Sequence, residues 1–218
     1  MFSRLNEYVV FFKEFRNRFE TTGAVLPSSR WLAGRLTWAL NGRDKTEPVR
    51  VLEVGPGTGA VTKRIVKLLR EGDRLDLVEL NGFFVSTLQR RFDSEPDFQR
   101  VASQVRIHCC PIQQFQCDEP YDFIISGLPF NNFSASLVDQ ILQSCLNMLS
   151  ESGTLSYFEY MGVRPLRMRV GKRAERQRLK ELDEVLRRYL TQFRIRRDLV
   201  LLNIPPALVH HLQKKPRT

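Results

Sequence analysis

The sequence contains few of the residues that build metal sites or disulfide frameworks. Among 218 residues there are 4 cysteines and 3 histidines. The cysteines form no C-x-x-C pair and the histidines supply no matching ligand spacing, so neither a metal site nor a disulfide scaffold is predicted. We expect free, buried thiols, as in a protein of the reducing cytoplasm. These are Cys109, Cys110, Cys117 and Cys145.

Long apolar runs are also missing. No stretch approaches the ~18 residues that a membrane-spanning helix needs. The first residues lack the basic-then-apolar order of a signal peptide. We therefore expect a cytoplasmic protein that meets a membrane only at its surface, on the inner face of the cytoplasmic membrane.

Acidic residues are in short supply, with 24 Asp and Glu against 34 Lys and Arg and a net charge of +10. Residues 162–197 contain thirteen basic and four acidic residues and so carry nearly all of the excess. A solvated helix face is one interpretation, but so uneven a balance favours a basic patch for an anionic partner. That partner is either a nucleic acid or an anionic membrane surface.

The first 22 residues predict an amphipathic helix ahead of a single α/β domain over residues 23–218. Residues 2–20 contain no glycine or proline. Such a helix can pack on the protein's own core, but its many aromatic residues and the basic segment favour a membrane-surface helix. Its apolar stripe consists of Leu5, Tyr8, Phe12, Phe15 and Phe19.

A nucleotide-binding pattern follows. Residues 49–54 predict a short buried strand, residues 55–59 a glycine-rich turn and residues 60–69 a helix, which is the order of a Rossmann unit. The turn has neither the G-x-G-x-x-G spacing of dinucleotide-binding proteins nor the ending of a P-loop. A second strand over residues 75–79 ends in Glu79, whose carboxylate can accept hydrogen bonds from both ribose hydroxyls.

The motif E-V-G-P-G-T-G at residues 53–59, with Glu79 at the next strand end, resembles the class I S-adenosylmethionine-dependent methyltransferases. The resemblance implies a Rossmann-like α/β fold whose seven-stranded, mostly parallel sheet has its last strand antiparallel. It implies S-adenosylmethionine as cofactor and S-adenosylhomocysteine as product. Further predicted strands cover residues 105–110, 121–126, 154–160, 198–203 and 207–213, and predicted helices cover residues 30–40, 136–149 and 174–190.

Residue roles follow from the same resemblance. The counterpart of Glu53 organises the methionine end of the site above the glycine turn, and the counterpart of Glu79 holds the ribose. Cys110 stands where the common pattern has an acid for the adenine amino group. The implied cofactor-binding residues are Glu53, Gly55, Gly57, Thr58, Gly59, Glu79, Leu80, Pro111, Ile112 and Ser126.

Residues 126–130, Ser-Gly-Leu-Pro-Phe, sit where amino methyltransferases carry their acceptor loop, whose backbone carbonyls orient an amine beside the methyl group. Two families resemble this half of the chain. The rRNA adenine-N6 dimethyltransferases share Leu-Pro-Phe and basicity. The aromatic start and residues 23–29, 53–59, 78–81, 126–129, 158–160 and 203–207, taken together and in this order, resemble the bacterial phospholipid N-methyltransferases. Because these enzymes convert phosphatidylethanolamine toward phosphatidylcholine, the resemblance implies a phospholipid substrate rather than a nucleic acid.

Within that resemblance we expect the catalytic residues to be Ser126, Gly127, Leu128 and Tyr160, which accept hydrogen bonds from the attacking amine. Phe130, Tyr157 and Tyr160 offer aromatic faces to a methylated head group, although core packing explains each of them equally well. The lipid phosphate is expected to meet arginines of the basic segment. These are Arg164, Arg167 and Arg169.

Overall fold

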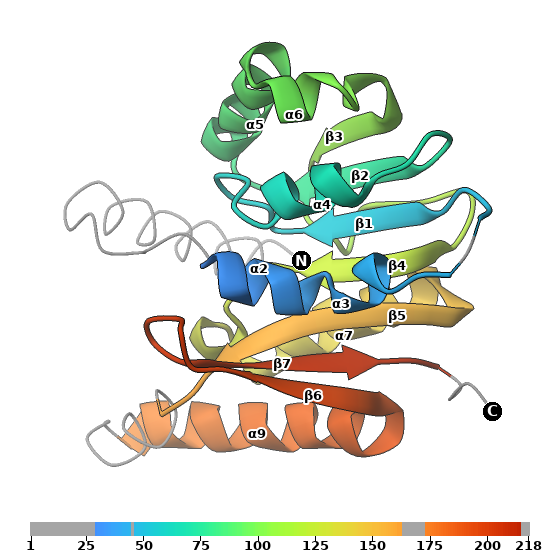
Figure 1. Ribbon diagram of the computed structural model, residues 1–218. Coiled ribbons are helices and arrows are strands. Elements are labelled where there is room, and N and C mark those ends of the chain that lie inside the picture. Colours follow the sequence, from blue (N-terminus) through green and yellow to red (C-terminus); the bar gives the residue numbers. More distant parts are fainter. Residues whose placement is uncertain (1–28, 45, 163–172, 215–218) are drawn as a thin grey trace.

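A seven-stranded sheet with the strand order β3-β2-β1-β4-β5-β7-β6 organises the protein (Figure 1). The computed structural model describes residues 29–44, 46–162 and 173–214. The predicted helix over residues 2–20, and Arg164, Arg167 and Arg169, lie outside these residues.

The first five strands are parallel, and β7 is antiparallel to both of its neighbours. The expected sheet is therefore confirmed. Its central strands β1, β2 and β4 are almost entirely buried, as expected when helices cover both faces of a parallel sheet. The strands are β1 (Arg50–Val54), β2 (Arg74–Glu79), β3 (Val105–Cys109), β4 (Tyr121–Ser126), β5 (Leu149–Tyr160), β6 (Arg194–Val200) and β7 (Ala207–Leu212).

Helices lie on both faces of the sheet and enclose two hydrophobic clusters. One cluster includes residues of α2, α4 and α5, and the other includes residues of α7 and α9. The helices are α2 (Arg30–Leu36), α3 (Trp38–Asn41), α4 (Thr62–Leu68), α5 (Gly82–Ser94), α6 (Pro96–Gln99), α7 (Ala135–Met148) and α9 (Arg173–Phe193), with 3₁₀ turns η1 (Ala102–Gln104) and η2 (Phe130–Asn132). Within these described ranges, no helix combines the length and the apolarity needed to cross a membrane.

Side-chain caps fix where several helices begin. Ser29 accepts a hydrogen bond from the backbone N–H of Leu32 at 3.2 Å, which confirms one of the two serines expected to cap this helix. Asn81 caps α5 and Ser134 caps α7 in the same way. These caps set the helix starts at the edge of the sheet where β1, β2 and β4 end.

Two strands differ from the sequence prediction. β5 already begins at Leu149, through the residues predicted to turn, because an irregularity in its register against β4 accommodates them. β6 covers Arg194–Val200 instead of residues 198–203. β6 is an edge strand rich in arginine, and charged side chains suit an edge because they discourage pairing with another chain. The apolar residues 199–202 therefore led to a predicted strand that begins and ends too late in the sequence.

The cysteines are free, but only Cys145 is buried. Cys109 is exposed because it ends β3, the strand at the other edge of the sheet, while Cys110 and Cys117 are partly exposed. The expectation that all four thiols are buried was therefore wrong for Cys109.

Candidate cofactor and acceptor site

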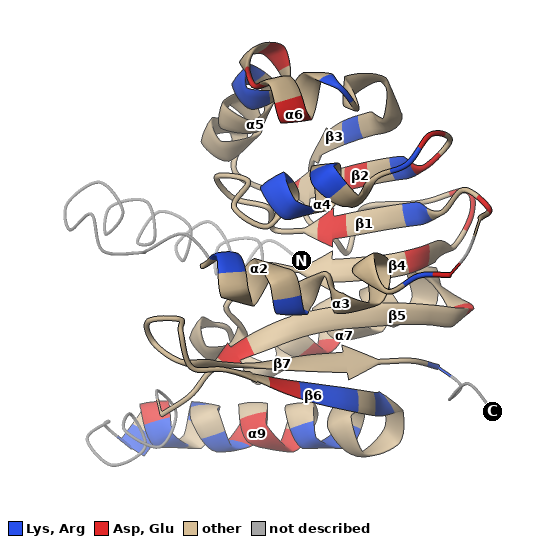
Figure 2. Ribbon diagram, in the orientation of Figure 1, with Lys and Arg blue, Asp and Glu red and all other residues tan. Residues whose placement is uncertain are grey.

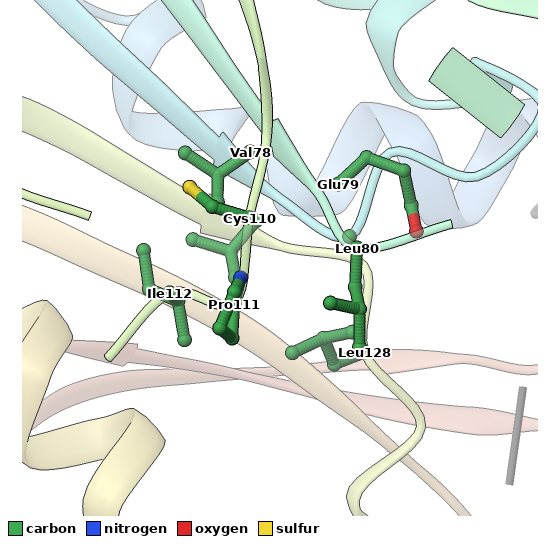
Figure 3. Close-up of a pocket in the computed structure, with 9 residues that line it drawn as sticks. Val78, Glu79, Leu80, Cys110, Pro111, Ile112 and Leu128 are labelled. Carbon is green, nitrogen blue, oxygen red and sulfur yellow. The ribbon is translucent and has the colours of Figure 1, made fainter. Parts of the chain in front are cut away.

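The carboxyl ends of β1, β2 and β4 lie side by side, because Val54 is paired with both Val78 and Ser126. A pocket opens at this point, where α/β sheets bind ligands. Glu79, Leu80 and Leu128 lie along one side in Figure 3. The full lining is Val54, Gly55, Val78, Glu79, Leu80, Cys110, Pro111, Ile112 and Leu128. Six of the residues predicted from the sequence thus meet around one pocket: Gly55, Glu79, Leu80, Pro111, Ile112 and Leu128.

The glycines of the turn after β1 are required by backbone geometry. Gly55, Gly57 and Gly59 have φ values of 69°, 55° and 82°, a region that other residues rarely adopt. A Cβ on Gly55 would also lie 2.3 Å from Cδ2 of Leu128. Next to Gly57 there is open space. The turn can therefore lie close to a ligand, as the glycine pattern predicts.

Glu79 is a buried acid, with 1% of its surface exposed. Its Oε2 accepts a hydrogen bond from the backbone N–H of Gly57 at 3.1 Å, and its Oε1 accepts one from that of Asn81 at 2.9 Å. Burial raises the pKa of Glu79, and these two hydrogen bonds oppose the rise. Glu79 therefore joins the end of β2 to the glycine turn and is no ordinary surface acid.

Glu53 is fully buried beneath the same turn. Its Oε2 accepts a hydrogen bond from the hydroxyl of Thr62 at 2.7 Å. Burial raises its pKa to about 8 against the opposing effect of this hydrogen bond, and nearby Glu79 adds to the rise. Oε1 has no hydrogen-bond partner among the described residues. An acid with an unused buried oxygen fits a cationic ligand, because the opposite charge favours its ionised form.

Arg91, on α5, fixes the glycine turn by hydrogen bonds and was not predicted from the sequence. Its Nη1 donates hydrogen bonds to the carbonyl oxygens of Thr58 at 2.8 Å and Gly59 at 3.0 Å. An ion pair with Glu95 at 2.6 Å and the ring of Phe98, 4.3 Å below the guanidinium, fix the side chain. The position of Thr58 in the turn is thus fixed by the hydrogen bond from Arg91 to its backbone carbonyl. No local sequence signal connects Arg91 with the glycine turn, because Thr58 and Gly59 lie more than thirty residues before it.

The acceptor loop packs directly on the glycine turn. The backbone N–H of Gly127 donates to the carbonyl of Val54 at 2.9 Å. The hydroxyl oxygen of Ser126 is buried and accepts a long hydrogen bond of 3.4 Å from the N–H of Leu128. The predicted catalytic residues Ser126, Gly127 and Leu128 therefore adjoin the predicted cofactor site.

The aromatic residues occupy different places. Phe130 and Tyr157 are buried in the core, with ring centroids 5.2 Å apart, and neither lines the pocket. Their positions agree with the core-packing alternative. Tyr160 is partly buried, which raises the pKa of its phenol, and its ring packs on Phe158 at 5.1 Å.

Asn131, just after the acceptor loop, was not predicted from the sequence. Its Nδ2 donates to the carbonyl of Tyr160 at 3.4 Å, which links the end of β4 to the end of β5. Its Oδ1 is buried and has no hydrogen-bond partner within the described ranges. Asn131 therefore offers an unused hydrogen-bond acceptor close to Tyr160.

The basic segment is less uniform than its composition suggests (Figure 2). Arg178 pairs with Glu175 at 2.8 Å and donates to the carbonyl of Asn131 at 3.1 Å, so this arginine supports the residues that follow the acceptor loop. Other arginines of α9 and β6 pair with acids within the fold: Arg187 with Asp183, Arg188 with Asp139, and Arg196 with Asp198. Part of the positive charge is thus used for structure.

Comparisons with known proteins agree with this geometry. Residues 51–153 match the family described as methyltransferase domain. An ornithine lipid N-methyltransferase of Singulisphaera acidiphila is 28% identical over 162 residues, which cover 72% of this chain and 80% of that protein. Ribosomal RNA small subunit methyltransferase A of Pseudomonas syringae is 33% identical over 100 residues, which cover 44% of this chain but only 33% of that protein.

Solved structures show the same fold. An S-adenosylmethionine-dependent methyltransferase from Clostridium acetobutylicum has a TM-score of 0.62 at 12% identity, covering 95% of this chain and all of the other (100%). The N-methyltransferase NodS from Bradyrhizobium japonicum, in complex with S-adenosyl-L-homocysteine, has a TM-score of 0.58 at 16% identity, covering 86% of this chain and 89% of NodS. Residues 51–153 thus match a methyltransferase domain, the chain has the fold of the class I methyltransferases, and its cofactor is S-adenosylmethionine.

Proposed function

We propose that this methyltransferase N-methylates phosphatidylethanolamine and its methylated intermediates toward phosphatidylcholine. The observation that supports the proposal is the packing of the loop at residues 126–129 on the glycine turn. In the proposal, the backbone carbonyls of this loop face the methyl group of the bound cofactor. The similarity to an ornithine lipid N-methyltransferase, over most of both chains, supports an aminolipid as the acceptor.

The amine must be neutral when it attacks. An amine with the pKa of lysine, ~10.4, lies about 3 units above neutral pH, so freeing its lone pair costs roughly 4 kcal/mol. The carbonyl oxygens of residues 126–128 accept hydrogen bonds from the neutral amine, and the buried Leu128 keeps water from that side of the pocket. Positioning of the nitrogen provides further acceleration.

Two side chains complete the acceptor site in this proposal. Tyr160 remains a neutral phenol, because burial raises its pKa, and it can accept a hydrogen bond. Asn131 adds its buried, unpaired Oδ1. S-adenosylmethionine supplies an electrophilic methyl group on a sulfonium. Residues 126–128, Tyr160 and Asn131 would orient the neutral lipid nitrogen toward this methyl group, and the proton left on the methylated amine would go to water.

Membrane binding belongs to the same proposal. The aromatic stripe within residues 2–20 and the basic segment 162–197 would hold the protein on the anionic inner face of the cytoplasmic membrane. Arg164, Arg167 and Arg169 would meet the lipid phosphate. The contribution of each basic residue near an anionic leaflet is ~1 kcal/mol, so binding should tighten as salt falls.

Methylation of rRNA adenine is the second candidate function. The matches to ribosomal RNA small subunit methyltransferase A proteins favour it, together with the net charge of +10. The chain spans about a third of the length of these relatives.

A single assay separates the two candidates. The protein is incubated with methyl-labelled S-adenosylmethionine and one of four acceptors: vesicles of phosphatidylethanolamine with phosphatidylglycerol, the same vesicles with ornithine lipid instead of phosphatidylethanolamine, vesicles of phosphatidylcholine alone, or rRNA. We expect label in the phosphatidylethanolamine vesicles. Label in ornithine lipid alone would show that ornithine lipid, and not phosphatidylethanolamine, is the substrate. Label in rRNA alone would refute lipid methylation. Mass spectrometry of the product gives the number of methyl groups added.

A further inference from the structure

Large apolar side chains are exposed on the loop between β6 and β7. Leu201, Leu202 and Ile204 have 65%, 67% and 78% of their surface exposed, and Leu199, near the end of β6, has 51%. A single exposed leucine is ordinary, but a group of large aliphatic side chains on one loop marks an interaction site.

The loop is held in a defined conformation from the inside. Asn203, between the exposed leucines and Ile204, is only 5% exposed. Its Oδ1 accepts a hydrogen bond from the backbone N–H of Ser29 at 3.2 Å, and its Nδ2 donates to the carbonyl of Pro205 at 2.7 Å. The usual arrangement of a loop is reversed here, since the polar side chain is buried and the apolar ones face solvent.

Neighbouring residues extend this surface. The hydrogen bond from Ser29 to Asn203 brings the start of α2 next to the loop. There Trp31 is 48% exposed, and the guanidinium of Arg30 lies 4.9 Å from the centre of its ring. Met161, 38% exposed, is held against the loop by a 2.7 Å hydrogen bond from its N–H to the carbonyl of Pro206.

The surface lies at the end of the molecule that holds the cofactor site. Figure 1 shows the β6–β7 loop at the same end of the sheet as the carboxyl ends of β1, β4 and β5. Asn131 connects the acceptor loop to the end of β5 through the carbonyl of Tyr160, and Met161 continues from there to the β6–β7 loop. A partner that binds this surface would therefore lie next to the acceptor site.

We propose that these residues form a docking surface that inserts into the head-group region of a lipid bilayer and turns the acceptor site toward it. The occupant is lipid because the apolar side chains stand on a loop and not in a groove, and because tryptophan and arginine beside aliphatic residues suit the boundary between lipid and water. The inference rests on the proposed function for its lipid substrate. The docking surface consists of Trp31, Met161, Leu199, Leu201, Leu202 and Ile204.

Basic residues at the same end provide the matching charge. Arg30 adjoins Trp31, and α9 begins with Arg173 and Arg176, both exposed, at the end of the molecule that carries the loop (Figure 2). An anionic leaflet would attract these groups while the apolar side chains enter it. The docking surface adds to the membrane contact proposed for residues 2–20.

The test compares two variants of the full chain. In Leu201→Ser/Leu202→Ser/Ile204→Ser the exposed loop side chains become small and polar, and in Ile195→Ser an exposed apolar residue (39%) at the other end of β6 changes in the same way. Both are assayed by flotation with phosphatidylethanolamine and phosphatidylglycerol vesicles. We expect about tenfold weaker partitioning for the triple variant and wild-type partitioning for Ile195→Ser. Melting temperature and cofactor affinity should stay unchanged in both.

Wild-type partitioning of the triple variant would overturn the docking surface. If the melting temperature also falls or the oligomeric state changes, another part of this chain, or a second copy, covers the loop instead. Trp31 gives an independent readout: vesicles with brominated lipid should quench its fluorescence, and the quenching should disappear in Trp31→Phe. Equal quenching in Trp31→Phe would count against insertion.

Activity on two forms of the lipid keeps this inference separate from the proposed function. On a short-chain phosphatidylethanolamine below its micelle concentration, the triple variant should work at the wild-type rate, whereas on vesicles it should be about tenfold slower. If the wild-type protein methylates neither form, the proposed function fails, and the flotation result still decides whether the loop docks on membranes.

Discussion

Gly127 and Gly55 approach each other so closely that a Cβ on Gly127 would lie 2.6 Å from the carbonyl oxygen of Gly55. The acceptor loop and the glycine turn therefore touch through their backbones. Any side chain at Gly127 would therefore force the two loops apart.

Gly127→Ala should disrupt both halves of the site. The added methyl meets backbone and not a flexible side chain, so we expect a loss of about 1–3 kcal/mol in unfolding free energy together with weaker cofactor binding. Gly34→Ala, within α2 and with nothing within 4 Å, is the matched control and should gain about 0.5–1 kcal/mol. Urea unfolding and calorimetric titration with S-adenosylmethionine measure both effects. Equal stability of the two variants would contradict the close contact.

Cofactor binding should release a proton from Glu53. With a pKa of about 8, this buried acid is mostly protonated at pH 7. If the cationic cofactor lies nearby, it lowers that pKa, so its affinity should rise from pH 6 to pH 8. Titration calorimetry at pH 7 in two buffers of different ionisation enthalpy counts the released protons. Glu53→Gln should abolish the release, whereas Glu119→Gln, at a side chain that is 67% exposed, should leave it unchanged. Identical release from wild type and Glu53→Gln would assign the proton elsewhere.

His211 should make stability depend on pH. It lies between Ser156, whose hydroxyl is 2.8 Å from Nδ1, and Asp198, 3.2 Å from Nε2. Burial lowers the pKa of His211 to about 4 against the opposing effect of the Asp198 carboxylate. In the unfolded chain His211 therefore binds a proton near pH 6.5, whereas in the folded protein it binds one only near pH 4. Because protonation favours the unfolded chain, the free energy of unfolding decreases as the pH falls through this window.

The expected loss from His211 is on the order of 3 kcal/mol between pH 7 and pH 4, measured by urea unfolding. His211→Gln should be less stable at pH 7 but should lose less stability on acidification. Equal pH dependence in the two proteins would show that other groups cause it. Since Ser156 and His211 are both buried, the Ser156–His211–Asp198 network stabilises the junction of β5, β6 and β7.

Cys110 lines the pocket, and the resemblance to class I methyltransferases implies an acid at this position for the adenine amino group. Burial raises the pKa of its thiol, so the side chain stays neutral. Cys110→Asp should supply the missing acceptor and tighten S-adenosylmethionine binding about fivefold, the effect of roughly 1 kcal/mol. Cys109→Asp, one residue earlier and exposed, serves as control and should not change binding. Weaker binding in Cys110→Asp alone would place the adenine elsewhere.

Local patterns in the sequence were sufficient to predict several residues that line the pocket. A buried strand, glycines with positive φ and an acid at the next strand end are neighbours along the chain, and parallel strands bring their carboxyl ends together. The positions of Glu79 and Gly55 in the site therefore follow from the sequence alone. Leu80, Pro111 and Ile112 follow from the same rule, since each comes just after a strand.

Contacts between distant parts of the chain account for the other site residues. Arg91 reaches the glycine turn, Arg178 supports the acceptor region and Asn131 joins two strand ends, although the sequence shows each only as a polar residue.

A Rossmann-like sheet with a glycine-lined site could be predicted from the residues alone, because both depend on backbone conformation and on hydrophobic periods within short segments. That β6 ends at Val200 and leaves Leu201, Leu202 and Ile204 exposed emerges only from the packing of the whole chain. An apolar residue looks the same in a strand and on a surface, and its exposure depends on which distant residues, here Ser29 and Asn203, hold the backbone in place.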